Sequence, residues 1–152
     1  MDAFDRHLLM LVQRDNRRTH EDLGREVGLS PSAVRRRLTQ LRRTGVIRAD
    51  GALLDPARIG ETVIVLVRME EESPETYRAM EARVMDCPHI TACYAVCGEN
   101  DFVIVTHFPS VSAFDAWAKS SLMSDPAVAR YTSHVVTQTL KHDTAIAVAE
   151  SA

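Results

Sequence analysis

The sequence predicts an α+β protein in two parts, and three observations lead to this expectation. The first 60 of the 152 residues show the apolar spacing of a helix three times in succession. After residue 60 the pattern changes to short apolar runs that alternate with helical segments. The charge changes sign at the same point: residues 1–60 hold 12 arginines and 8 acidic residues, whereas the remainder holds 6 basic and 13 acidic residues. We therefore expect one domain over residues 1–60, linker included, and a second over residues 61–152.

The first part is expected to form three helices. Apolar residues at positions i, i+4, i+7 and i+8 predict an amphipathic helix over residues 4–12. Thr19 supplies a hydroxyl that can cap a second helix over residues 20–27. Ser30 caps a third helix, which has proline at its first position and runs to about Thr44. A glycine follows the second helix and another follows the third, as is typical of helix ends.

A β-hairpin is expected after the third helix. Residues 46–48 and 52–54 are apolar or extended in character, and they flank Asp50-Gly51, a pair that favours a type I′ turn. Two helices, a tight turn, a third helix and a hairpin form a winged helix-turn-helix. Residues 55–60 contain proline and glycine and are expected to be a connector.

The second part follows the order β-α-β-β-α-β, which is the ferredoxin-like arrangement. The expected strands cover residues 63–69, 90–97, 102–108 and 131–140, and the expected helices cover residues 74–85 and 110–123. Right-handed crossovers would place the first and third strands in the middle of the sheet, with both helices on one face. The opposite face would then be apolar and uncovered, and a second copy of the chain is the simplest cover.

The third helix is the candidate DNA-binding element. Val34, Leu38 and Leu41 define its buried stripe, and the opposite side carries serine, threonine, glutamine and arginine, which suit the major groove of double-stranded DNA. Either this face contacts DNA or it is a solvated charged face. Arg37 lies near the apolar stripe, so we expect it to pack there and to pair with an acid. The predicted DNA-binding residues are Ser30, Ser32, Arg35, Arg36, Thr39, Gln40, Arg43 and Arg48.

A small-molecule site is predicted at the turn between the second and third strands. Gly98 can expose backbone N–H groups to a carboxylate, and Asp101 can pair with an α-amino group. Ser133 and Thr137 would add hydroxyls if they face the same cleft. The alternative is that this turn only joins two strands. The predicted effector-binding residues are Gly98, Glu99, Asn100, Asp101, Ser133 and Thr137.

Composition excludes several other classes of protein. With 26% charged residues and only short aliphatic runs, the chain offers no membrane span. The N-terminus does not resemble a secretory signal, and the three cysteines form no even disulfide set, so we expect a cytoplasmic protein. The six histidines lack metal-ligand spacing. We expect no metal, no cofactor and no catalytic residue.

The pattern of residues resembles the Lrp/AsnC family of bacterial and archaeal transcription regulators along nearly the whole chain. In the first part the similar residues are Asp5, Leu8, Leu9, Arg18, Leu23, residues 27–30, Val34, Arg37, Leu38, Leu41, residues 45–48, residues 54–56 and Gly60. In the second part residues 98–102 resemble the Gly-x-x-Asp-aromatic turn of the family's effector-binding module. The resemblance implies a homodimer built through the effector modules, often assembled into octamers. It also implies an amino acid or a related metabolite as effector.

Two other functions are alternatives to a DNA-binding regulator. The sirohaem decarboxylases resemble this family, so an enzyme on the same scaffold is one alternative. A metabolic sensor that binds an amino acid and a protein partner is the other. Both predict a weakly basic third helix, whereas six arginines lie between Arg35 and Arg48. The sequence therefore favours a sequence-specific DNA-binding regulator that responds to a small metabolite.

Overall fold

The computed structural model describes residues 1–148, so the last four residues of the expected second domain lie outside it. The described residues form two compact units. The first comprises Met1–Leu53 together with the tail that begins at Asp143, and the second comprises Leu54–His142. No helix among the described residues has the length and apolar character needed to cross a membrane.

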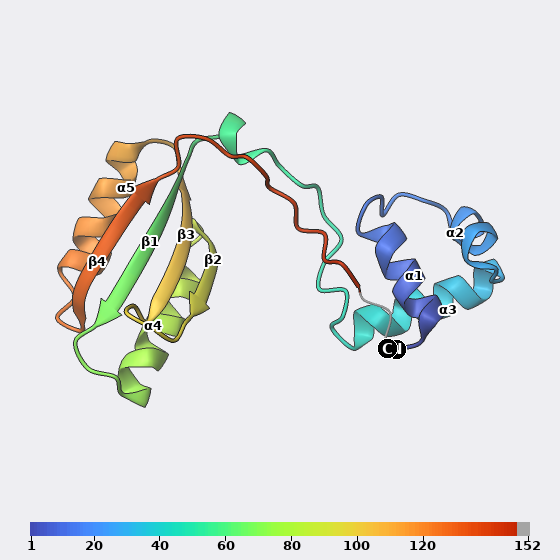
Figure 1. The fold of residues 1–152 in the computed structure, drawn as a ribbon, viewed down its shortest axis with the longest axis horizontal. Coiled ribbons are helices and arrows are strands. Elements are labelled where there is room, and N and C mark those ends of the chain that lie inside the picture. The colour runs from blue at the N-terminus through green and yellow to red at the C-terminus, as the bar shows by residue number, and fades with distance from the viewer. Residues whose placement is uncertain (149–152) are drawn as a thin grey trace. The chain divides into compact units, whose positions relative to one another are not determined.

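The first unit contains the three expected helices, each started by a side-chain cap. Helix α1 spans Ala3–Val12, α2 spans His20–Val27 and α3 spans Pro31–Arg43. The N-caps are Asp2, Thr19 and Ser30, whose side chains accept hydrogen bonds from backbone N–H groups of the first turn. Gly28 ends α2 with φ of 76°, a left-handed conformation that suits glycine. These helix predictions are confirmed (Figure 1).

The core of the first unit is built from residues of all three helices. Seven apolar side chains form this core, namely Leu8, Leu9, Leu23, Val27, Val34, Leu38 and Leu41. Gly24 lies where α2 meets the turn, and a Cβ atom added there would lie 2.4 Å from the carbonyl oxygen of Leu29. Only glycine therefore allows the turn to approach α2 this closely.

The expected hairpin is not formed, and the prediction of a wing over residues 46–54 is wrong. No strand occurs between α3 and the short 3₁₀ helix η1, Pro56–Arg58, in this described segment. Gly51 lacks the positive φ that a type I′ turn requires. Asp50 is held instead by Arg42, whose Nε and Nη2 donate to its two carboxylate oxygens over 2.8 and 3.0 Å. A two-stranded hairpin without a third strand or a packed face is marginal, and Leu53 and Leu54 are exposed.

The second unit contains the predicted βαββαβ fold. Strands β1 (Glu61–Met69), β2 (Ile90–Ala95), β3 (Phe102–Phe108) and β4 (Val128–Val135) form an antiparallel sheet in the order β2-β3-β1-β4. Helix α4 spans Pro74–Asp86 and α5 spans Val111–Ala118, continued by a π-helical turn, η2, over Lys119–Met123. The central position of the first and third strands is confirmed (Figure 1).

The last strand differs from its expected limits of residues 131–140. It begins at Val128, immediately after a turn in which Asp125 accepts the N–H of Ala127. It ends at Val135, which pairs with Val63 of the neighbouring strand β1. Val136 still donates its N–H to the carbonyl oxygen of Thr62 over 2.9 Å, but Thr137 lies outside the strand.

The two faces of the sheet have different environments. Both helices cover one face, where Met80 of α4 and Phe114 of α5 join Val63, Val65 and Val67 in a single core. The register of the strands places Ile64, Leu66, Val103, Val105 and Tyr94 together on the opposite face. The first four are half-buried and Tyr94 is 58% exposed. The second unit therefore has an apolar face that its own helices do not cover.

Candidate nucleic-acid interface and ligand turn

Helix α3 presents one buried side and one polar side, as the sequence predicts. Val34, Leu38 and Leu41 are at most 5% exposed and hold the helix against the core. Because helical residues three and four apart share a side, the polar residues between these anchors must face outward. The predicted residues Ser32, Arg35, Arg36, Thr39, Gln40 and Arg43 are all exposed.

Arg37 anchors α3 to the start of the chain. Its Nη1 donates to Asp2 over 2.7 Å and to Asp5 over 2.8 Å, and its guanidinium lies 5.4 Å from the centre of the Phe4 ring. These hydrogen bonds raise the pKa of Arg37, with that from Asp5 the larger. The prediction that Arg37 packs against apolar residues and pairs with an acid is confirmed. Its guanidinium is thus engaged inside the unit.

The outward arginines differ in whether their guanidinium groups already bond to other residues of the protein. Within the described residues, Arg35 and Arg36 make no ion pair or side-chain hydrogen bond. Nε and Nη2 of Arg43 donate to Oε1 of Gln40 over 3.1 and 2.9 Å, which orients the carboxamide and leaves its Nε2 without a partner in the described chain. The Arg42 guanidinium pairs with Asp50 and lowers the pKa of that carboxyl group. Two free guanidinium groups and an oriented amide therefore share one exposed side.

Ser30 immediately precedes α3, and Arg48 follows it in the chain. The Ser30 hydroxyl accepts the N–H of Ala33 over 3.3 Å and lies 3.1 Å from the Ser32 hydroxyl, so it caps α3. Arg48 lies five residues beyond the helix, in the extended segment where the hairpin was expected, and it is exposed. An exposed helix side with arginine and glutamine can donate to guanine and adenine edges in the major groove, and its flanking arginines can reach phosphates.

The predicted ligand turn lies between β2 and β3. Gly98 has φ of 148°, which glycine adopts readily, and both Gly98 and Glu99 are exposed. Asn100 is half-buried. The turn thus presents exposed backbone beside a glycine, the feature for which the sequence singled it out.

Asp101 is used inside the protein. Its Oδ2 accepts the N–H of Met69 over 2.7 Å, and its Oδ1 accepts the hydroxyl of Tyr77 over 2.6 Å. The side chain is only 9% exposed. The hydrogen bond to Asp101, together with partial burial, raises the pKa of Tyr77 to about 12. One carboxylate therefore joins the end of β1, the first turn of α4 and the ligand turn.

Ser133 and Thr137, the two hydroxyl residues predicted to contribute to the ligand site, lie at different positions relative to β4. Ser133 is exposed on β4 and pairs with Val65. The ligand turn ends just before Phe102, which pairs with Val67 of β1. Thr137 lies two residues after Val135, which pairs with Val63 of β1. These levels on β1 are four residues apart, about 13 Å. A single chain does not bring Thr137 to the turn.

Two contributors to these regions were not identified from the sequence. Gly24 permits the close approach of α2 and the turn before α3, and a glycine inside a predicted helix was a signal for it. Tyr77 holds Asp101 from 24 residues away, and nothing in the local pattern indicates such a contact. Among residues 1–148, no group of three histidine, cysteine or acidic side chains is arranged to hold a metal ion.

Comparison with family models gives matches to both units. A model of the AsnC-type helix-turn-helix domain matches residues 1–42. A model of the Lrp/AsnC ligand binding domain matches residues 62–146, which is more than half of the chain.

Known proteins and structures match over almost the full length. The leucine-responsive regulatory protein of Salmonella typhimurium is 28% identical over 150 residues, which cover 97% of this chain and 92% of that protein. The crystal structure of a transcriptional regulator from Neisseria meningitidis in complex with L-Met is 30% identical, with a TM-score of 0.85 and 96% of each chain covered. An AsnC family transcriptional regulator from Agrobacterium tumefaciens is 29% identical, with the same TM-score and coverage.

Proposed function

This chain belongs to the Lrp/AsnC family of DNA-binding transcriptional regulators, and we propose that it reads DNA through the outward side of α3 under the control of an amino acid. The observation that carries this proposal is the side of α3 on which Arg35 and Arg36 are exposed and without partners in the described chain. The proposed function is binding and regulation without a catalytic step. It places the protein in the cytoplasm, with the DNA that it binds.

Base reading is assigned to the middle of α3 and phosphate contact to its ends. Arg36 lies one helical turn before Thr39 and Gln40 on the exposed side, and all three can reach base edges. Ser30, Ser32, Arg35, Arg43 and Arg48 flank them and suit the DNA backbone, where contacts fix position without reading sequence.

The turn at Gly98 is the proposed effector site. Its exposed backbone can donate to the carboxylate of an amino acid, and the complex of the Neisseria meningitidis regulator with L-Met supports an amino acid as the class of ligand. Asp101 holds the turn in place through Met69 and Tyr77, so we assign it to positioning. This assignment replaces the pairing with an α-amino group that the sequence alone suggested.

The uncovered face of the sheet is the proposed homodimer interface. Ile64, Leu66, Val103, Val105 and Tyr94 form a continuous apolar surface, which a second copy would bury by two-fold symmetry. A dimer places two α3 helices on one DNA molecule, and two half-sites raise affinity without any new contact. Larger assemblies of such dimers, octamers included, are part of the proposal.

Fluorescence anisotropy with the DNA upstream of the protein's own gene tests the DNA-binding proposal. We expect the labelled upstream duplex to bind more tightly than a shuffled duplex of the same length and base composition. Repeating the titration at two salt concentrations separates phosphate contacts from base reading, because the phosphate part weakens steeply with salt. Equal affinity for both duplexes at both salt concentrations would contradict sequence-specific regulation through this DNA.

Calorimetry with a panel of amino acids, L-methionine and L-leucine included, tests the effector site. We expect at least one amino acid to bind the intact protein and to change its affinity for the upstream duplex. Substitution of Gly98 by valine should abolish this binding, because a β-branched residue is strained at φ of 148°. Retained binding in Gly98→Val would place the effector elsewhere.

A further inference from the structure

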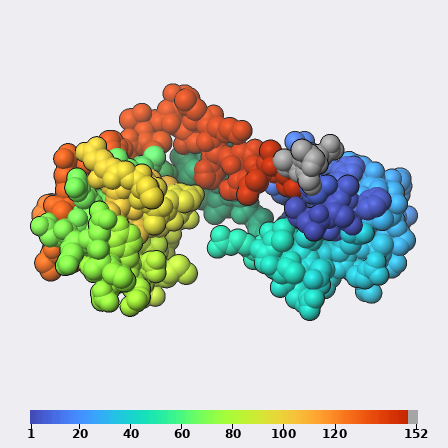
Figure 2. Space-filling view, turned by 60° about the horizontal axis from the view of Figure 1, so that its bottom comes forward, coloured from blue at the N-terminus to red at the C-terminus, as the bar shows by residue number. Residues whose placement is uncertain are grey.

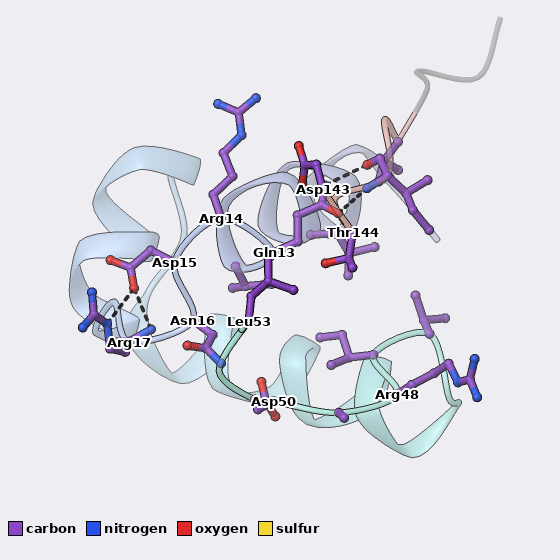
Figure 3. A pocket seen from close by; sticks show the side chains of 18 of the residues that line it. Gln13, Arg14, Asp15, Asn16, Arg17, Arg48, Asp50, Leu53, Asp143 and Thr144 are labelled. Carbon is purple, nitrogen blue, oxygen red and sulfur yellow. Dashed lines mark hydrogen bonds and ion pairs between the residues drawn. The ribbon is translucent and has the colours of Figure 1, made fainter. Parts of the chain in front are cut away.

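The first unit holds a segment that comes from the far end of the chain. Residues 143–148 form one wall of a groove whose other walls are the C-terminal end of α1, the loop after it and the segment that follows α3. Figure 3 shows this groove, which is lined by Gln13, Asn16, Asp50 and Leu53 and by Asp143 and Thr144 of the tail. In Figure 2 the red tail reaches the dark blue N-terminal residues.

Gln13 clamps the tail by its side chain. Its Nε2 donates to the carbonyl oxygen of Ile146 over 2.8 Å, and its Oε1 accepts the N–H of Ile146 over 2.8 Å. The carboxamide thus bonds both backbone groups of one residue, as a neighbouring strand would. Arg14, the next residue, points away from the tail (Figure 3). The clamp is therefore specific to the side chain at position 13.

The tail also extends the hydrophobic core. Val148 packs against the cluster that contains Leu8, Leu9 and Leu41 and is itself half-buried. Ile47, from the segment after α3, packs against the same cluster. The tail and this segment therefore cover neighbouring parts of one core.

A unit of this size needs such additions. Met1–Leu53 buries seven apolar side chains, and domains of about 50 residues bury too little surface to be more than marginally stable alone. Each apolar contact and backbone hydrogen bond from the tail is thus a large share of the unit's stability.

We propose that the groove beside Gln13 is a docking site for the chain's own C-terminal segment, residues 143–148, and that the docked tail completes and stabilises the helix-turn-helix unit. The occupant is given by the structure, because the tail bonds to Gln13 through Ile146 and packs on the core cluster of this unit through Val148. Because the tail follows residue 142 in the chain, the first unit is joined covalently to residues 54–142 at both ends of that range, at Leu53 and again at Asp143.

Hydrogen exchange on the full-length protein tests the docking directly. In the wild type we expect the Ile146 amide to exchange more slowly than the amides of residues 138–142. Gln13→Ala removes both clamp bonds and should raise the exchange rate of the Ile146 amide by about tenfold. Gln138→Ala is the matched control, because its side chain makes no hydrogen bond within the described residues, and it should leave the Ile146 rate unchanged.

Thermal unfolding tests the stabilisation. The single tryptophan and all three tyrosines lie within residues 54–142, so fluorescence follows that unit alone, while circular dichroism also follows α1–α3. Gln13→Ala should lower the melting temperature of the helix-turn-helix unit by roughly 4 to 8 °C and leave the fluorescence transition in place. Ile146→Pro removes the tail's N–H donor without altering α1 and should produce the same shift, whereas Thr139→Pro should not.

Two results would overturn the proposal. One is an Ile146 amide in the wild type that exchanges as fast as those of residues 138–142. The other is a chain ending at His142 whose first unit melts at the wild-type temperature. Neither measurement involves DNA or an amino acid, so the outcome is independent of the proposed regulatory function.

Discussion

The two candidate sites of this protein differ in what their polar side chains are already doing. On α3 the outward arginines Arg35 and Arg36 make no ion pair within the described residues, whereas Arg37 pairs with Asp2 and Asp5 and Arg42 pairs with Asp50. At the ligand turn the one carboxylate that suggested a binding role, Asp101, accepts hydrogen bonds from Met69 and Tyr77. Arg35 and Arg36 of α3 are therefore available to a partner, whereas the acid of the turn is already bonded to residues of β1 and α4.

This difference follows from how each element is stabilised. A helix satisfies its own backbone, and its apolar stripe alone fixes it to the core, so the other side is left for function. The N–H of Met69 at the end of β1 needs a partner, and the nearby Asp101 carboxylate is a strong acceptor for it. A charged residue on an exposed helix side is therefore better evidence for binding than one in a turn.

The largest effect should come from removing an anchor of α3. Leu38 is 2% exposed, and Leu38→Ala should cost about 2 to 5 kcal/mol, through lost burial and the cavity left behind. A unit of this size should then be largely unfolded, with loss of DNA binding. Urea titrations followed by circular dichroism and by Trp117 fluorescence should separate the two units. If the Trp117 transition shifts as much as the helical signal, the units unfold together and the comparison between them fails.

Removal of the Asp101 carboxylate should have the next largest effect, now in the second unit. Asp101→Ala leaves the N–H of Met69 and the hydroxyl of Tyr77 without their acceptor and should lower stability by roughly 2 to 3 kcal/mol. The Trp117 transition in urea measures it. Glu99→Ala, at an exposed neighbour in the same turn, is the control and should change stability by less than about 0.5 kcal/mol. If both variants change stability equally and only slightly, the Asp101 carboxylate is not needed for the fold and is available to bind the ligand.

A smaller effect, confined to DNA binding, is expected from Arg36→Ala. Loss of one base contact should weaken specific binding by about 1 to 3 kcal/mol and leave the folded state unchanged. Arg58→Ala in η1 removes the same charge from a residue of the second unit and should weaken specific binding far less. Anisotropy titrations of both variants with the upstream and shuffled duplexes make the comparison. A loss of equal size in both variants would mean that only net charge matters and that α3 reads no bases.

Local patterns predicted most of the fold because they express local physics. The caps Thr19 and Ser30 and the left-handed Gly28 act on neighbouring residues, and the limits of α2 and α3 were predicted to within a residue. The hairpin failed because Asp50-Gly51 has good turn chemistry but no adjoining strand or packed face to keep two short strands together. Arg42 then holds Asp50 in another conformation.

The two sites also differ in how much of each the sequence predicts, because sequence patterns report only local contacts. The side of α3 follows from a period of 3.6 residues, so its exposed residues could be named in advance. The role of Asp101 depends on Tyr77 and Met69, which come from other elements, and the tail contact of Gln13 spans 133 positions in the chain. No window of sequence contains both partners of such contacts, and only the folded chain brings them together.

The smallest predicted effect is in the ionisation of Tyr77, and it tests the turn without disrupting it. The neutral phenol donates to Asp101, whereas a phenolate would face the carboxylate at 2.6 Å, which is why the pKa of Tyr77 is raised to about 12. Because the pKa of an unfolded tyrosine is about 10, this bond stabilises the fold fully below about pH 10. The contribution is lost as the pH rises from 10 through about 12.

Absorbance at 295 nm, which follows tyrosine ionisation, should therefore show one of the three tyrosines titrating near pH 12 in the wild type. In Tyr77→Phe that step should be missing, while the ring can still pack against Phe102, whose centroid lies 5.1 Å away. In Asp101→Asn the step should move toward pH 10, since the amide carries no charge to oppose the phenolate. If the step stays near 12 in Asp101→Asn, burial and not the carboxylate governs Tyr77. Asp101 would then be free to serve the ligand, as the outward arginines of α3 are free to serve DNA.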